Sequence, residues 1–202
     1  MTGPPLAALR RLTGARRTVS APPADSASAE ERCDLCAVSL GPEHPHLVDV
    51  RSRRLLCGCR PCALLFSDER ADLRYRTIPD RYLSLGDPLD EVELPVGLAF
   101  VFRNSAQDRM VACYPGPAGA TESELPLPAW TRLVERHPAL ATLRPDVEAL
   151  LIRPADCHLV PIDACYELAG TLRTLWQGFD GGPAAHAAID AFFARVRQRS
   201  HS

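Results

Sequence analysis

Four cysteines of this sequence have the spacing of a metal site. Cys33 and Cys36 form one C-x-x-C pair, and Cys59 and Cys62 form a second. A two-residue spacer places both thiolates of a pair on one tight turn, from which they reach a shared ion at about 2.3 Å. Two such turns complete the sulfur tetrahedron of a structural zinc ion. We therefore expect Cys33, Cys36, Cys59 and Cys62 to bind one zinc ion.

A fifth cysteine, Cys57, leaves one part of this assignment open. It begins the run CGCRPC over residues 57–62, so five thiols are available for four positions. We favour Cys59 as the ligand because it keeps the two-residue spacing with Cys62. The alternative has Cys57 as the ligand and Cys59 free.

Other ligands and other occupants are also possible for this site. His44 and His46 lie between the two cysteine pairs and could replace one cysteine, although exposed loop histidines without a ligand role are more common. An iron–sulfur cluster is the alternative occupant because thiolates hold such clusters too. The spacing does not match the known ferredoxin patterns, so zinc remains the preferred metal.

The elements around the cysteines indicate a small zinc-ribbon-like module. Residues 46–50 and 54–57 are apolar-rich and flank the polar Arg51-Ser52-Arg53, which predicts a β-hairpin. The order of cysteine pair, hairpin and cysteine pair is that of a zinc ribbon. We assign the module to residues 31–84, after a Ser/Ala/Pro-rich tail over residues 1–30 that we expect to be disordered.

Residues 85–202 are predicted to form an α+β domain with an antiparallel or mixed sheet and flanking helices. The strand at 95–102 is apolar without a break, so we expect both of its faces to be covered. Pro115–Gly119 reads as an irregular loop, and Asp163 as the N-cap of a helix. Further strands are expected over 109–114, 147–152 and 158–161, and further helices around 130–137 and after Pro183.

The composition excludes several kinds of enzyme. All 23 basic residues are Arg, so Schiff-base chemistry and the lysines of P-loops and kinases are excluded. The motifs GxSxG, GxGxxG and HExxH do not occur. Thr121–Glu124 could be a binding loop, or could serve in a turn and a helix cap. We therefore expect a non-enzymatic protein.

Charge and hydropathy restrict the partners. The net charge is −2, which gives no general attraction to nucleic acid. Residues 51–81 hold eight Arg and four acidic residues, so a nucleic-acid-binding ribbon is an alternative, but few aromatic residues lie among them. No apolar run approaches the roughly 20 residues of a membrane span.

The N-terminal Arg pairs are not followed by the apolar segment of an export signal, so we expect a cytoplasmic protein. Thiols stay reduced in that compartment, which favours metal binding over disulfides. The remaining cysteines, Cys113, Cys157 and Cys165, are expected to be buried and inert.

Several segments resemble an actinobacterial family of unknown function whose genes often lie beside those of [NiFe] hydrogenases. The segments are ERCDLC (31–36), RRLLCGCRPCALLF (53–66), LPVGLAFVFRNS (94–105), YPGPAGATES (114–123) and LVPIDACYELAGTLRTLW (159–176). The resemblance implies an accessory role in hydrogenase maturation or assembly, with a hydrogenase subunit or maturation factor as the protein partner. A redox or metal-handling role, such as iron–sulfur or metal transfer, is the alternative.

Overall fold

The hairpin predicted between the cysteine pairs is present. The structure is a computed structural model, and it describes residues 31–68, 74–85, 97–154 and 156–200. β1 (His46–Asp49) pairs antiparallel with β2 (Arg54–Cys57), so that Leu47 lies opposite Leu56. The predicted tail over residues 1–30 lies outside the described residues.

A third strand and a short helix complete what we call the cysteine module, which consists of the first cysteine pair, β1, β2, β3 and α1. β3 (Tyr75–Thr77) pairs with the other side of β1 and gives the order β2-β1-β3. α1 (Arg60–Leu65) begins directly after Cys59 and has Pro61 in its first turn, where a missing N–H carries no penalty. Neither α1 nor β3 was predicted from the sequence.

The second sheet is antiparallel throughout, with the order β4-β9-β8-β5-β6-β7. We call it the large sheet. Its strands are β4 (Leu83–Ser84), β5 (Ala99–Asn104), β6 (Arg109–Gly116), β7 (Gly119–Leu125), β8 (Glu148–Arg153) and β9 (Asp156–Pro161). The prediction of an α+β fold with flanking helices is confirmed.

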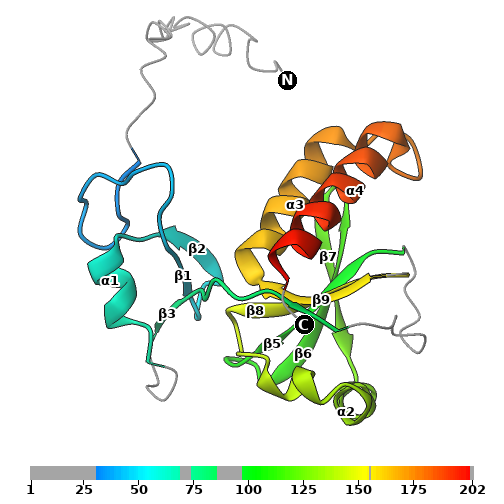
Figure 1. The fold of residues 1–202 in the computed structure, drawn as a ribbon, viewed down its shortest axis with the longest axis horizontal. Helices are drawn as coiled ribbons and strands as arrows, with labels where there is room; N and C mark the ends of the chain where they lie inside the picture. The colour runs from blue at the N-terminus through cyan, green and yellow to red at the C-terminus, as the bar shows by residue number, and fades with distance from the viewer. Residues whose placement is uncertain (1–30, 69–73, 86–96, 155, 201–202) are drawn as a thin grey trace, which may run out of the picture. The chain divides into compact units, whose positions relative to one another are not determined.

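Helices cover both faces of the large sheet (Figure 1). Phe100 and Phe102 pack in the cluster that includes α3 (Ile162–Leu175) and α4 (Gly182–Arg199). Val101 belongs to the opposite cluster, with α2 (Leu127–Arg136) and the 3₁₀ turn Pro138–Thr142. This alternation explains why the strand is apolar at consecutive positions.

Two local predictions were wrong. Pro115–Gly119 is a tight hairpin turn and not an irregular loop, because Gly119 takes a φ of 106° and β7 returns beside β6. Thr121–Glu124 therefore lie in a strand. α3 begins at Ile162 after Pro161, so Asp163 lies in the first helical turn. Among the described residues, no helix has the length and hydrophobicity of a bilayer span.

Candidate metal centre

The first cysteine pair lies on a tight turn that the backbone closes by itself. Cys33 N–H donates to the Val38 carbonyl at 2.9 Å, and Ala37 N–H donates to the Cys33 carbonyl at 2.8 Å. Ala37 has a φ of 62°, which is unusual for a residue with a side chain. These contacts hold the Cys33 and Cys36 side chains on one side of the turn.

The second cysteine pair lies at the start of α1. Cys59 directly precedes the helix, and its carbonyl accepts a hydrogen bond from Ala63 N–H at 2.9 Å. Cys62 lies in the first turn. Gly58 allows β2 to approach β1 before this helix, because a Cβ at Gly58 would stand 2.2 Å from Leu47 Cδ1. The second pair is therefore positioned by a strand end and a helix start.

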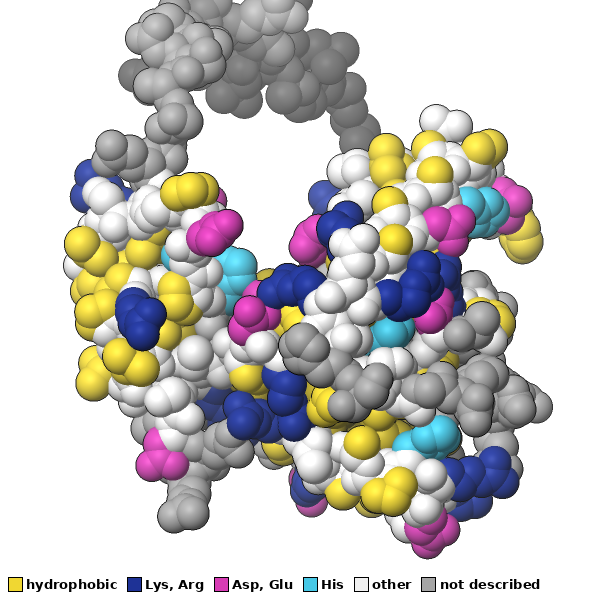
Figure 2. Space-filling view, viewed as in Figure 1, with side chains coloured by type: hydrophobic (Ala, Val, Ile, Leu, Met, Phe, Trp, Pro, Cys, Tyr) yellow, Lys and Arg dark blue, Asp and Glu magenta, His cyan; other side chains and the backbone are white. Residues whose placement is uncertain are grey.

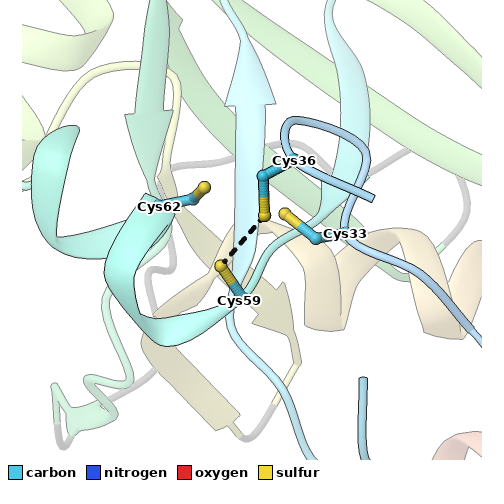
Figure 3. Close-up of side chains that lie close together, drawn as sticks. All are labelled: Cys33, Cys36, Cys59 and Cys62. Carbon is cyan, nitrogen blue, oxygen red and sulfur yellow. Dashed lines mark hydrogen bonds between the residues drawn. The ribbon is translucent and has the colours of Figure 1, made fainter. Parts of the chain in front are cut away.

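The structure brings together the four cysteines predicted as ligands. The Sγ atoms of the four residues all lie within 4.8 Å of one another (Figure 3): Cys33, Cys36, Cys59 and Cys62. The Sγ atoms of Cys36 and Cys59 are 3.6 Å apart. A disulfide would bring two sulfurs to about 2.05 Å, whereas sulfurs 2.3 Å from one tetrahedral ion lie about 3.8 Å apart. The set has the dimensions of a site for one metal ion.

The thiols of this set influence one another's ionisation. Burial opposes ionisation of Cys33, but hydrogen bonds from the backbone of Cys59, Cys36 and Leu35 outweigh it and lower the pKa of Cys33 to about 6. The hydrogen bond with Cys59, together with burial, raises the pKa of Cys62 to about 12. One thiolate is thus stabilised by the backbone, and further thiolates need a cation to balance their charge.

Cys57 does not belong to this group of sulfurs. Cys57 forms a second cluster with His44 and His46. In this cluster Cys57 Sγ and one ring nitrogen of each histidine lie within 4.8 Å of one another. Burial, followed by the charges of Glu31 and Asp34, raises the pKa of the Cys57 thiol. From the sequence, Cys57 was expected only as an alternative to Cys59 in the four-thiolate site. No spacing in the sequence predicted its cluster with His44 and His46.

The other cysteines lie in the interior. Cys113, Cys157 and Cys165 are all buried. Burial raises the pKa of Cys113 to about 12 and that of Cys165 well above its usual value. The surroundings of Cys113 and Cys165 therefore oppose formation of the nucleophilic thiolate.

Several arginines of the stretch 51–81 are engaged by carboxylates. Arg53 pairs with Glu122 on β7, and Arg74 pairs with Asp49 at 2.8 Å. Two further pairs are Arg76 with Asp146 and Arg81 with the fully buried Glu148. These contacts give the stretch a structural role within the chain, which its sequence alone did not reveal.

Comparison with protein families gives one match. The model of DUF5947, a family of unknown function, matches residues 32–200. The chain belongs to this family. Both cysteine pairs, His44, His46 and Cys57 fall within the part that matches DUF5947. A search of curated proteins and a search of solved structures found no match.

Proposed function

We propose that the four-thiolate site binds one structural zinc ion. The observation that carries this proposal is the mutual approach of four sulfurs within 4.8 Å, with 3.6 Å between Cys36 and Cys59. A single tetrahedral ion accepts these separations. A four-iron cluster attaches each thiolate to a different iron, so its sulfurs stand farther apart than those on a shared ion.

The metal has a folding role in this proposal. The cysteine module has few buried apolar side chains, of which Leu47 is the one fully enclosed. Binding free energy of a structural zinc becomes folding free energy when the site does not exist in the unfolded chain. The role is placed in the cytoplasm, where cysteine ligands remain reduced.

The biological role that we propose is that of a non-enzymatic accessory protein. Apolar side chains are exposed on the cysteine module: Leu64 and Leu65 of α1 are 64% and 71% exposed, and Val38 is 50% exposed. Figure 2 shows hydrophobic side chains over the region of α1. Such a patch suits a protein partner. The family resemblance favours a hydrogenase subunit or maturation factor as that partner.

A co-purification experiment tests this role. The tagged chain is expressed together with the genes of a [NiFe] hydrogenase and its maturation factors, and captured proteins are identified by mass spectrometry. We expect the wild type to capture a hydrogenase component and the double variant Leu64→Ser/Leu65→Ser to lose it. Leu127→Ser is the matched control, because Leu127 is 60% exposed on α2. Failure of the wild type to capture any hydrogenase component would contradict the proposal.

A metal-handling role is the second candidate. The observation that favours it is the cluster of His44, His46 and Cys57, which supplies metal-binding atoms beyond the four thiolates. Rapid exchange of bound metal with free metal would support this role. Exchange over days, as for a closed structural site, would favour the accessory role alone.

A further inference from the structure

The histidines beside Cys57 are oriented by hydrogen bonds. His44 Nδ1 is 2.9 Å from the Gly41 carbonyl, and His46 Nδ1 is 2.7 Å from Asp163 Oδ2. Both partners accept hydrogen bonds, so Nδ1 carries the proton in each ring. In the neutral rings the lone pair available for a ligand is therefore on Nε2.

His44 Nε2 is buried without a hydrogen-bond partner among the described residues. The side chain of His44 is 8% exposed. A buried polar atom without a partner destabilises the folded chain, because it loses its hydrogen bonds to water and gains none. A metal ion bonded to Nε2 would satisfy this atom, whereas the existing contacts of the ring do not.

The contact between His46 and Asp163 has the form of a supported metal ligand. Histidines that bind metals usually donate their other ring N–H to a carboxylate or carbonyl, which fixes the ring and strengthens the ligand. Asp163 lies on α3, far from His46 in the sequence, so the large-sheet part of the chain supports this ring. The Gly41 carbonyl serves His44 in the same way.

The third ligand atom comes from Cys57 in a negatively charged surrounding. The Cys57 N–H donates to Asp34 Oδ2 at 2.7 Å, and Asp34 N–H donates to the Cys57 carbonyl at 2.9 Å. Glu31 Oε2 lies 3.6 Å from His44 Nδ1. With Asp163 beside His46, three carboxylates thus accompany the thiol and both imidazoles, and their charge favours a cation.

We propose that His44, His46 and Cys57 form a second metal site, separate from the four-thiolate centre, for a borderline divalent cation such as Zn²⁺ or Co²⁺. Two imidazoles and one thiolate are suitable ligands for such ions. The site has three protein ligands, and the side chain of His46 is 38% exposed. Three protein ligands with solvent access leave a fourth position open, unlike a closed structural site.

Cobalt titration of the full-length chain tests the second site. The chain, loaded with one equivalent of Zn²⁺, is titrated with Co²⁺ under reducing conditions, and the thiolate-to-cobalt charge-transfer band is recorded. We expect one equivalent of Co²⁺ to produce the band in the wild type. Cys57→Ala should abolish the band, and azide should change the wild-type spectrum by entering the open position.

Two further variants separate ligation from folding. Asp163→Asn leaves the three ligands in place and should weaken Co²⁺ binding about 10- to 100-fold, as loss of a supporting hydrogen bond does. His186→Ala changes an exposed histidine of α4 and should bind Co²⁺ as the wild type does. Circular dichroism checks that each variant is folded.

The proposal is overturned if the zinc-loaded wild type gives no cobalt–thiolate band, or if folded Cys57→Ala gives the same band. An unchanged affinity in folded Asp163→Asn would also contradict the proposed support of His46. Failure of the four-thiolate centre would be seen separately, as a chain that does not retain the first equivalent of Zn²⁺.

Discussion

The large sheet and the cysteine module are stabilised in different ways. The large sheet has an apolar cluster on each face, and side chains such as Phe100, Leu150 and Phe193 are fully buried. The cysteine module has a three-stranded sheet, a six-residue helix and the group of four thiols. Small sheets of this size rarely bury enough apolar surface to be stable alone. From this comparison we expect metal ligation to supply the stability that core packing in the module does not.

Metal removal should have the largest effect and should act on the cysteine module. Structural zinc contributes about 10–16 kcal/mol of binding free energy in small zinc-finger peptides. We expect chelation to remove part of such a contribution from the stability of the module. We expect amide hydrogen exchange to accelerate over residues 31–66 and to remain slow in β5 and β6. Equal protection of the module before and after chelation would contradict the comparison.

Phe193→Ala should act on the other region. Phe193 is fully buried between α4 and the large sheet, and truncation of such a side chain costs about 3–5 kcal/mol. Chemical denaturation monitored by circular dichroism should show this loss. The folded variant should retain its metal. A large drop in metal content per folded chain would show that metal binding in the cysteine module depends on packing around the large sheet.

Gly58→Ala should disturb the cysteine module through packing. The added Cβ would stand 2.2 Å from Leu47 Cδ1, so buried Leu47 must shift, at a cost of about 1–3 kcal/mol. Gly170→Ala is the matched control. Gly170 lies exposed in α3, where an added Cβ would meet no atom within 4 Å beyond its chain neighbours and the surrounding helix backbone, and the change should stabilise by about 0.5–1 kcal/mol. Thermal unfolding of both variants measures the difference. Equal melting temperatures for Gly58→Ala and Gly170→Ala would contradict the close packing of Gly58 against Leu47.

Asp49 should make the cysteine module sensitive to acid. Its carboxylate accepts hydrogen bonds from Arg74 and from the backbone of Arg51 and Ser52, and the Arg74 contact holds the pKa of Asp49 well below its usual value of 3.8. A lowered folded-state pKa stabilises above about pH 4, and this stabilisation is lost as the pH falls.

Asp49→Asn should therefore cost about 1–3 kcal/mol at pH 7. The difference in unfolding free energy between wild type and variant should shrink as the pH falls below 4. A difference that is constant from pH 7 to pH 3 would show that the charge of Asp49 is not responsible.

Glu122→Gln should have the smallest effect. The ion pair of Glu122 with Arg53 links β7 to the hairpin turn of the module, but both side chains are partly exposed, at 38% and 30%. Exposed pairs of this kind contribute about 0–1 kcal/mol. We expect a change below 1 kcal/mol in denaturant unfolding, and a larger loss would show that this contact stabilises the module more than an exposed ion pair normally does.

The sequence predicted those features that depend on local pattern. The two-residue spacing of Cys33 with Cys36 indicated a shared turn, and the uninterrupted apolar run through Phe100 indicated a strand covered on both faces. Both features are present in the structure. The four-cysteine group needed no knowledge of distant contacts, because two C-x-x-C pairs flank a hairpin.

Features that depend on long-range contacts were missed. β7 has the sequence GATESEL, which is typical of a polar loop. It is a strand because it pairs with β6. The cluster of His44, His46 and Cys57 depends on β1 and β2 pairing in the register that places His46 opposite Cys57. The support of His46 by Asp163 joins residues 117 apart, which no local pattern could indicate.

We infer that Cys33, Cys36, Cys59 and Cys62 bind a metal ion that stabilises the cysteine module. The most direct test is elemental analysis of the freshly purified full-length chain, beside Cys36→Ser and Cys113→Ser. We expect zinc in the wild type and in Cys113→Ser, and the loss of one equivalent in Cys36→Ser. A wild-type chain that contains no metal while its amides over residues 31–66 remain protected from exchange would contradict the claim.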